Sequence, residues 1–215
     1  MTFYRYVDAN RVVIWLAALL GLGGFLPRLI GAPFFDPHLM VAFAAMAVVF
    51  QAPLICESVG ADAGKQASRK ALSRKVTIAA GFGFFSSLLL MLIRTVASNR
   101  EIDAPYFLYP DAPVIGALLL LALGFAQFGA AAGAYLTLHS DSPETARSRL
   151  RTGFLAALLA LVAAAKFGPE SWRAAITALL TNDLILIASG IVYGVLTLAA
   201  IFLYRASARH PQYAH

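Results

Sequence analysis

The sequence predicts an all-α polytopic membrane protein of about six transmembrane helices, with both termini on the cytoplasmic side. Apolar residues make up 60% of the 215-residue chain and charged residues only 13%, whereas soluble domains average about 45–50% and about 25%. The apolar residues also collect into long blocks instead of alternating with polar ones at helical or strand period. Such blocks need lipid around them, so we expect a single transmembrane domain covering residues 1–215.

Six apolar blocks are the predicted spans. Most approach or exceed the roughly 20 residues needed to cross a hydrocarbon core about 30 Å thick. They comprise residues 12–30, 39–56, 76–93, 114–138, 143–167 and 184–204. The fifth block is short in apolar residues, and five spans is the alternative. We expect its helix to begin at Pro143, because proline suits the first helical position and Ser142 can cap it.

The positions of lysine and arginine predict the orientation, because positive residues near helix ends are retained on the cytoplasmic side. With the N-terminus inside, twelve of the seventeen fall in inner segments. They are Arg5, Arg11, Lys65, Arg69, Lys70, Arg74, Lys75, Arg147, Arg149, Arg151, Arg205 and Arg209. We therefore interpret the net charge of +6 as a topology signal, not as nucleic-acid binding. The expected location is the cell membrane, such as a bacterial inner membrane, with the lipid bilayer as surroundings.

Three connecting segments carry further signals. Residues 57–75 form the largest predicted inner loop, which ends in a basic run. Residues 169–182 predict a short amphipathic helix on the outer surface before the last span, because Trp172, Ile176 and Leu179 recur at helical spacing. The C-terminal segment 206–215 is polar, and we expect it to be loose.

No motif predicts catalysis or a cofactor. Residues 60–66 resemble a phosphate-binding loop, but one residue is missing between the glycines and Gln66 stands where serine or threonine should reach magnesium. The four histidines are scattered without metal-ligand spacing, and no Gly-x-Ser-x-Gly elbow occurs. We therefore expect no metal site, no cofactor and no enzymatic activity in this chain.

Polar side chains within the spans are candidates for an intramembrane polar path, since charge in hydrocarbon is expensive and usually functional. Arg28, Gln51 and Gln127 are these candidates. In the alternative interpretation, Arg28 reaches the headgroups and the two glutamines bond between helices.

Two pairs of glycines lie four residues apart, Gly129 with Gly133 and Gly190 with Gly194. Each pair places both glycines on one helix face and permits close backbone approach. The pattern is compatible with a dimer seam and with packing inside the chain, and both stay open.

The overall layout resembles the membrane subunit of an ABC-2 type transporter. The resemblance is centred on Glu57 at the end of the second span and on the run Ser73-Arg74-Lys75 that leads into Val76. It implies a coupling helix in this loop that docks a cytoplasmic ABC ATPase, which would hydrolyse the ATP. The docking residues would be Glu57, Arg69, Lys70, Arg74 and Lys75. It also implies a second permease copy or a paralogue as partner.

We therefore expect a permease subunit of an ATP-driven exporter. The alternative is a non-catalytic accessory or scaffold subunit of a larger membrane complex, because the spans carry little charge and many small residues. An enzyme that acts within the membrane ranks third.

Overall fold

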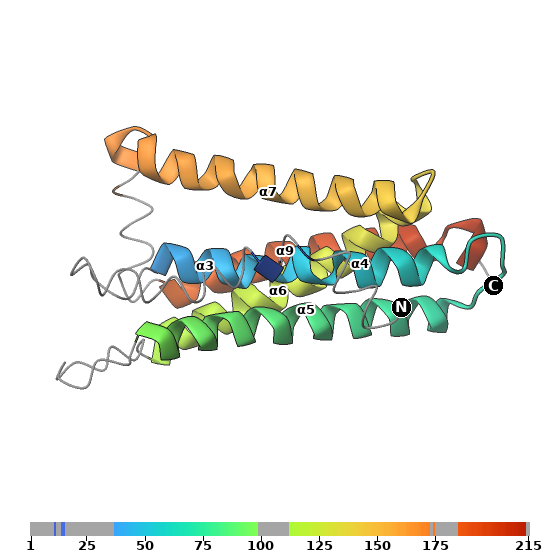
Figure 1. The fold of residues 1–215 in the computed structure, drawn as a ribbon, viewed down its shortest axis with the longest axis horizontal. Helices are drawn as coiled ribbons and strands as arrows, with labels where there is room; N and C mark the ends of the chain where they lie inside the picture. The colour runs from blue at the N-terminus through green and yellow to red at the C-terminus, as the bar shows by residue number, and fades with distance from the viewer. Residues whose placement is uncertain are drawn as a thin grey trace.

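The computed structural model describes residues 37–98, 112–172 and 185–213, together with residues 11, 14, 15 and 174. Within this part of the chain, every regular element is a helix. The elements are α3 (Pro37–Ala45), α4 (Ala47–Gly60), α5 (Arg69–Ser98), α6 (Ala112–Leu138), α7 (Pro143–Phe167), α9 (Ile185–Ala208) and the 3-10 helix η2 (Pro211–Tyr213). The long helices lie side by side in an elongated bundle (Figure 1).

The second predicted span is longer than expected and is interrupted. It comprises α3 and α4, which meet at Met46. The Met46 N–H donates to the carbonyls of both Ala42 and Phe43, at 3.0 and 3.2 Å. Pro53 lies inside α4, where it cannot donate the usual hydrogen bond to the fourth residue before it. The span therefore has two irregular points along its length.

Helix α5 begins at Arg69, seven residues before the predicted start. The Ser68 hydroxyl accepts from the Ala71 N–H at 3.2 Å and caps the helix. Arginine, lysine, alanine and leucine are strong helix formers, and Leu72 is fully buried. Of residues 57–75, the largest predicted inner loop, only residues 61–68 are non-helical.

Among the described residues, four helical segments are long and apolar enough to cross a membrane: Val41–Gly60, Arg69–Ile93, Pro113–Leu138 and Ile185–Ala208. Large apolar side chains such as Phe85, Leu198 and Phe202 are exposed on their outer faces, as expected for surfaces that contact lipid. The predicted first span, 12–30, and the predicted surface helix, 169–182, lie largely outside the described residues. The count of six spans and the orientation therefore stay predictions.

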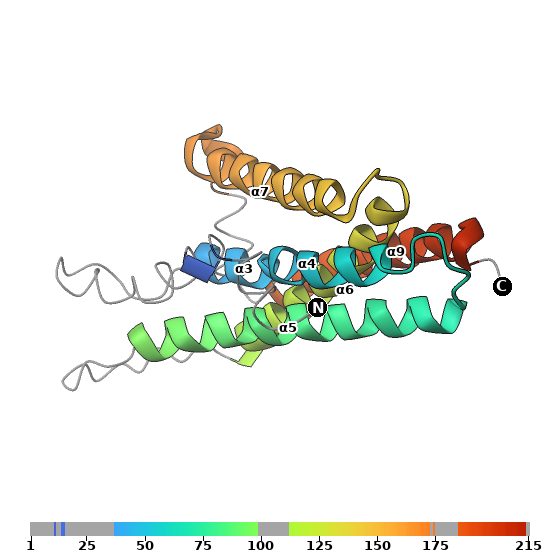
Figure 2. The same ribbon diagram turned by 45° about the vertical axis from the view of Figure 1, so that its right-hand side comes forward.

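Helix α7 has the predicted bounds. The Ser142 side chain accepts from the Thr145 N–H at 3.2 Å, and proline occupies the first turn. The first turns of α7 contain the charged residues Glu144, Arg147, Arg149 and Arg151. Helix α7 is not one of the four apolar segments. It packs on α4 and α6, on the opposite side of α4 from α5 (Figures 1 and 2).

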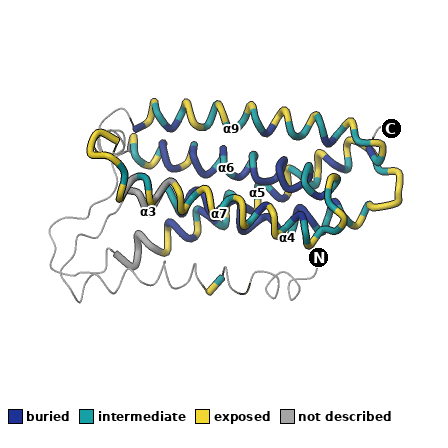
Figure 3. The backbone as a smooth tube through the Cα atoms, turned by 90° about the horizontal axis from the view of Figure 1, so that it is seen from above, coloured by how far each residue is buried: buried dark blue, intermediate teal, exposed yellow. Residues whose placement is uncertain are grey.

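The core lies around α4 and α6. Helix α6 packs on α3, α4, α5, α7 and α9, and Figure 3 shows buried residues along α4 and α6 with many exposed ones along α9. Many core residues are small, including Ala52, Ala122, Ala126 and Ala130. Small side chains let helix backbones approach closely, so the described helices pack in direct contact.

Candidate functional site

Most of the polar contacts between separate elements lie at one end of the bundle, which we call the Tyr213 end. It consists of the α4–α5 loop (residues 61–68), the α6–α7 turn (residues 139–142) and the C-terminal segment (residues 209–213), which lie near one another in Figures 1 and 2. The Ala67 N–H donates to the Gln212 carbonyl at 3.0 Å. The loop and the C-terminus are therefore joined directly.

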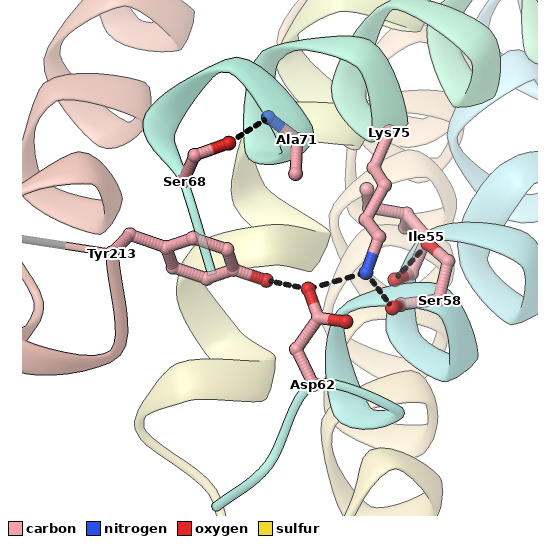
Figure 4. Close-up of polar contacts among 7 residues, drawn as sticks. All are labelled: Ile55, Ser58, Asp62, Ser68, Ala71, Lys75 and Tyr213. Carbon is pink, nitrogen blue, oxygen red and sulfur yellow. Dashed lines mark hydrogen bonds and ion pairs between the residues drawn. The ribbon is translucent and has the colours of Figure 1, made fainter. Parts of the chain in front are cut away.

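Asp62 is the centre of this end. Its Oδ2 atom accepts from the Tyr213 hydroxyl at 2.6 Å and from the Lys75 ammonium, which also donates to the Ser58 carbonyl at 2.5 Å (Figure 4). Partial burial acts to raise the pKa of Asp62, but the hydrogen bonds from Lys75 and Tyr213 and the charges of Lys75 and Lys65 outweigh it and lower the pKa. The ionised Asp62 carboxylate thus joins the α4–α5 loop to α5 and to the C-terminal segment.

Tyr213 is fully buried, with 0% of its surface exposed. Its ring belongs to a core cluster with Ile55, Val59 and Leu72. Burial and the hydrogen bond to Asp62 raise the pKa of Tyr213, so the phenol stays neutral and donates. The prediction of a loose segment over 206–215 is wrong for the described part, because α9 continues to Ala208 and η2 follows it.

Two of the five predicted docking residues are engaged inside the chain. Lys75 pairs with Asp62, as described above. Glu57 pairs with Arg147 at 3.5 Å and joins the end of α4 to the start of α7. Both Glu57 and Arg147 are partly exposed, and such pairs contribute about 0–1 kcal/mol. Glu57 and Lys75 therefore fix the positions of neighbouring elements.

The other three predicted docking residues are exposed. Arg69, Lys70 and Arg74 lie on the first two turns of α5. None of the three forms an ion pair with another described residue. We call this group the α5 basic surface. Its charges are free to meet another molecule, and arginine offers a fork of donors that matches carboxylates and phosphates.

Gln51 is the buried polar residue at the middle of the bundle. Its Nε2 donates to the Ala126 carbonyl at 2.9 Å, while its Oε1 is buried without a hydrogen-bond partner among the described residues. A Cβ atom added at Gly129 would lie 2.3 Å from Nε2, and one at Gly83 would lie 3.0 Å from Oε1. The side chain thus fills a slot between α5 and α6.

The candidates for a polar path are not brought together. Gln127 accepts from the Thr197 hydroxyl at 2.9 Å and so joins α6 to α9, whereas Gln51 faces α5 and α6. Arg28 lies outside the described residues. Gln51 and Gln127 therefore bond to different neighbouring helices.

The two glycine pairs differ in their surroundings. Cβ atoms added at Gly129 and Gly133 would lie 2.3 Å from Gln51 Nε2 and 2.4 Å from Ile55 Cγ2. The first pair therefore packs α6 against α4. Around Gly190 and Gly194 on α9, an added Cβ would meet no described atom within 4 Å. The second pair is open to another helix.

Replacing Gln51 by methionine is expected to leave the melting temperature in detergent unchanged or to raise it. A buried unpaired acceptor costs about 1–3 kcal/mol, and the single neutral hydrogen bond that is lost contributes about 1 kcal/mol. Gln51→Glu is the control, since a carboxylate at this depth is costly and should lower the melting temperature clearly. A Gln51→Met variant that melts as before but loses activity would indicate a polar path instead of packing.

The chain matches no protein-family model, no curated protein and no solved structure.

Proposed function

We propose that the chain is the membrane-spanning permease subunit of an ATP-driven exporter of the ABC-2 type. In this proposal it crosses the cell membrane six times with the Tyr213 end in the cytoplasm, and a separate ATPase docks on the α5 basic surface. The observation that carries the proposal is the exposure of Arg69, Lys70 and Arg74 at the start of a helix that is long and apolar enough to span the membrane.

The surroundings of the α5 basic surface support a role in docking. The adjacent Lys75 is bonded to Asp62 and to the Ser58 carbonyl, so the first turns of α5 are held in place. Exposed charges of one sign favour a partner with acidic groups and increase the rate of association. Because this surface is rigid, movement of a bound partner would move helix α5 with it.

Helix α5 itself is the proposed coupling element. The resemblance implies a separate coupling helix in the loop, but residues 61–68 form turns, bends and irregular backbone instead. Helix α5 has 30 residues, and at 1.5 Å per residue it is about 45 Å long. A push on its first turns would therefore reach the opposite end of the bundle through one continuous helix.

A second candidate function is an accessory or scaffold subunit. The close packing around α4 and α6 favours it, because small residues bring the helices into contact and Gln51 and Gln127 bond to different helices. In this case the α5 basic surface would contact a partner that is not an ATPase. Purification of the chain from its native membrane in mild detergent separates the two functions. A co-purifying ATPase supports the exporter, and a membrane complex without an ATPase supports the scaffold.

Replacing Arg69, Lys70 and Arg74 together by glutamine is expected to abolish ATPase binding and transport. The melting temperature should change little, because the three side chains are exposed and form no ion pair with described residues. Co-purification of the ATPase, measured with tagged protein, tests the proposal directly.

The matched control replaces Arg149, Arg205 and Arg209 by glutamine, since these residues are also exposed and the change in charge is equal. The control should bind the ATPase normally. Accessibility of a C-terminal tag to protease in sealed vesicles shows whether either triple variant has changed orientation. Equal loss of binding in both triple variants would contradict a specific docking surface.

A further inference from the structure

The C-terminal segment is fastened across the Tyr213 end as a strap. The Gln212 carbonyl accepts from the Ala67 N–H at 3.0 Å, and the Tyr213 hydroxyl donates to Asp62 at 2.6 Å. The Tyr213 ring is fully buried, and its hydroxyl points to the Asp62 carboxylate (Figure 4). Residues 209–213 are thereby attached to a loop about 150 residues earlier in the sequence.

His210 forms the base of this strap. Its carbonyl accepts from the Tyr213 N–H at 2.8 Å, and its Nδ1 accepts from the Gln212 N–H at 3.4 Å. A ring nitrogen that accepts a hydrogen bond carries no proton. A protonated Nδ1 can no longer accept from the Gln212 N–H. Two N–H donors then face each other, and the contact is lost.

A second histidine faces His210 from the end of α6. The rings of His139 and His210 are 5.8 Å apart. His139 stacks on Tyr135 at 4.2 Å, and its Nδ1–H donates to the Tyr135 carbonyl at 2.8 Å, so it is held in position. When both histidines are charged, they repel each other across this short distance.

Other charged groups lie on the same segment, on α9 and on the α4–α5 loop. Arg209 on the same segment and Arg205 on the last turns of α9 are both positive and exposed. From the α4–α5 loop, the Asp62 carboxylate is bonded to Tyr213 and Lys75, and Lys65 is a further positive charge near it. The charge that lowers the pKa of His210 is that of His139, and Asp141 on the α6–α7 turn is the exposed acidic residue on that side.

We propose that the C-terminal strap is a pH-sensitive latch, which opens from the α4–α5 loop when His210 becomes protonated. Burial and the charge of His139 lower the pKa of His210 from its ordinary value of 6.5, so the closed strap binds a proton less readily than the open one. The stability of the closed strap is present above pH 6.5 and is lost as the pH falls through the lowered pKa. Opening withdraws Tyr213 from Asp62 beside the first turns of α5.

Hydrogen–deuterium exchange of the purified full chain in detergent at pH 7.5 and pH 5.0 tests the latch. After correction for the intrinsic effect of pH, the amides of residues 67 and 212–213 should exchange at least tenfold faster at pH 5.0. The amides in the middle of α6 should keep their protection, which shows that the bundle itself remains folded. Equal protection of the strap at both pH values would overturn the proposal.

The variant His210→Asn provides the matched control. Asparagine can place an acceptor oxygen near the position of Nδ1 but takes up no proton in this range. The strap of this variant should show the same protection at pH 7.5 and pH 5.0, while the wild-type strap opens. If the variant strap still opens at pH 5.0 to the wild-type extent, His210 is not the switch and the proposal is wrong.

Discussion

Gly129→Val is expected to prevent the folded protein from accumulating. A Cβ atom at this position would lie 2.3 Å from Gln51 Nε2 and 2.9 Å from Val48 Cα. The second atom belongs to the backbone of α4, so a rotamer change cannot relieve the clash and the two helices must separate. Overpacking a core costs about 1–3 kcal/mol when the surroundings can adjust. Here the backbone of α4 would have to move, so we expect a larger cost. Size-exclusion chromatography of a fluorescent fusion measures the yield of folded protein.

The control for this prediction is Gly190→Val, which places the same substitution in α9. No described atom lies within 4 Å of a Cβ added at Gly190, and the new side chain would extend the exposed apolar face of that helix. We expect a yield and a melting temperature close to the wild-type values. Damage as severe as that of Gly129→Val would mean that the α9 glycines contact another helix, as in the dimer seam that the sequence left open.

The helices that could be predicted are those defined by local signals. The predicted span 114–138 corresponds to α6, which begins two residues earlier, and the predicted bounds of α7 are the observed ones. In α7 the cap of Ser142 and the first-turn Pro143 are adjacent in sequence. An apolar block and a helix cap each depend only on residues that are neighbours in sequence, so both can be predicted from the sequence alone.

Helix α5 begins before the predicted span because apolarity and helicity are different properties. The apolar block begins at Val76, but the basic residues before it also form helix and are anchored by the buried Leu72. The hydrocarbon core determines where the charged residues end and the apolar segment begins. It does not determine where the helix begins, because charged residues outside the core also form helical hydrogen bonds.

The candidate site was only partly predictable because its contacts join distant residues. Asp62 and Tyr213 are 151 residues apart, and Glu57 and Arg147 are 90 residues apart. No local pattern around Asp62 or Tyr213 marks either residue as a partner. The basic run was visible in the sequence, but its division into an internally bonded Lys75 and an exposed Arg69, Lys70 and Arg74 depends on tertiary structure.

Tyr213→Ala is expected to cause the largest loss of stability at the Tyr213 end. Removal of a fully buried aromatic side chain costs about 3–5 kcal/mol, and Tyr213 has 0% exposure. The substitution also leaves Asp62 with one donor fewer. The melting temperature in detergent should fall on the order of 10 °C.

Tyr213→Phe separates the ring from its hydroxyl. The ring keeps its contacts with the cluster around Ile55 and Leu72, while the hydrogen bond to the Asp62 carboxylate, of a kind that contributes about 1.5–3 kcal/mol, is lost. The melting temperature should therefore fall less than in Tyr213→Ala. Gln212→Ala should keep the contact with Ala67, because the backbone carbonyl of Gln212 makes it. If both Tyr213→Ala and Tyr213→Phe melt like the wild type, the C-terminal segment does not hold the α4–α5 loop, and burial of Tyr213 contributes nothing to the stability of the bundle.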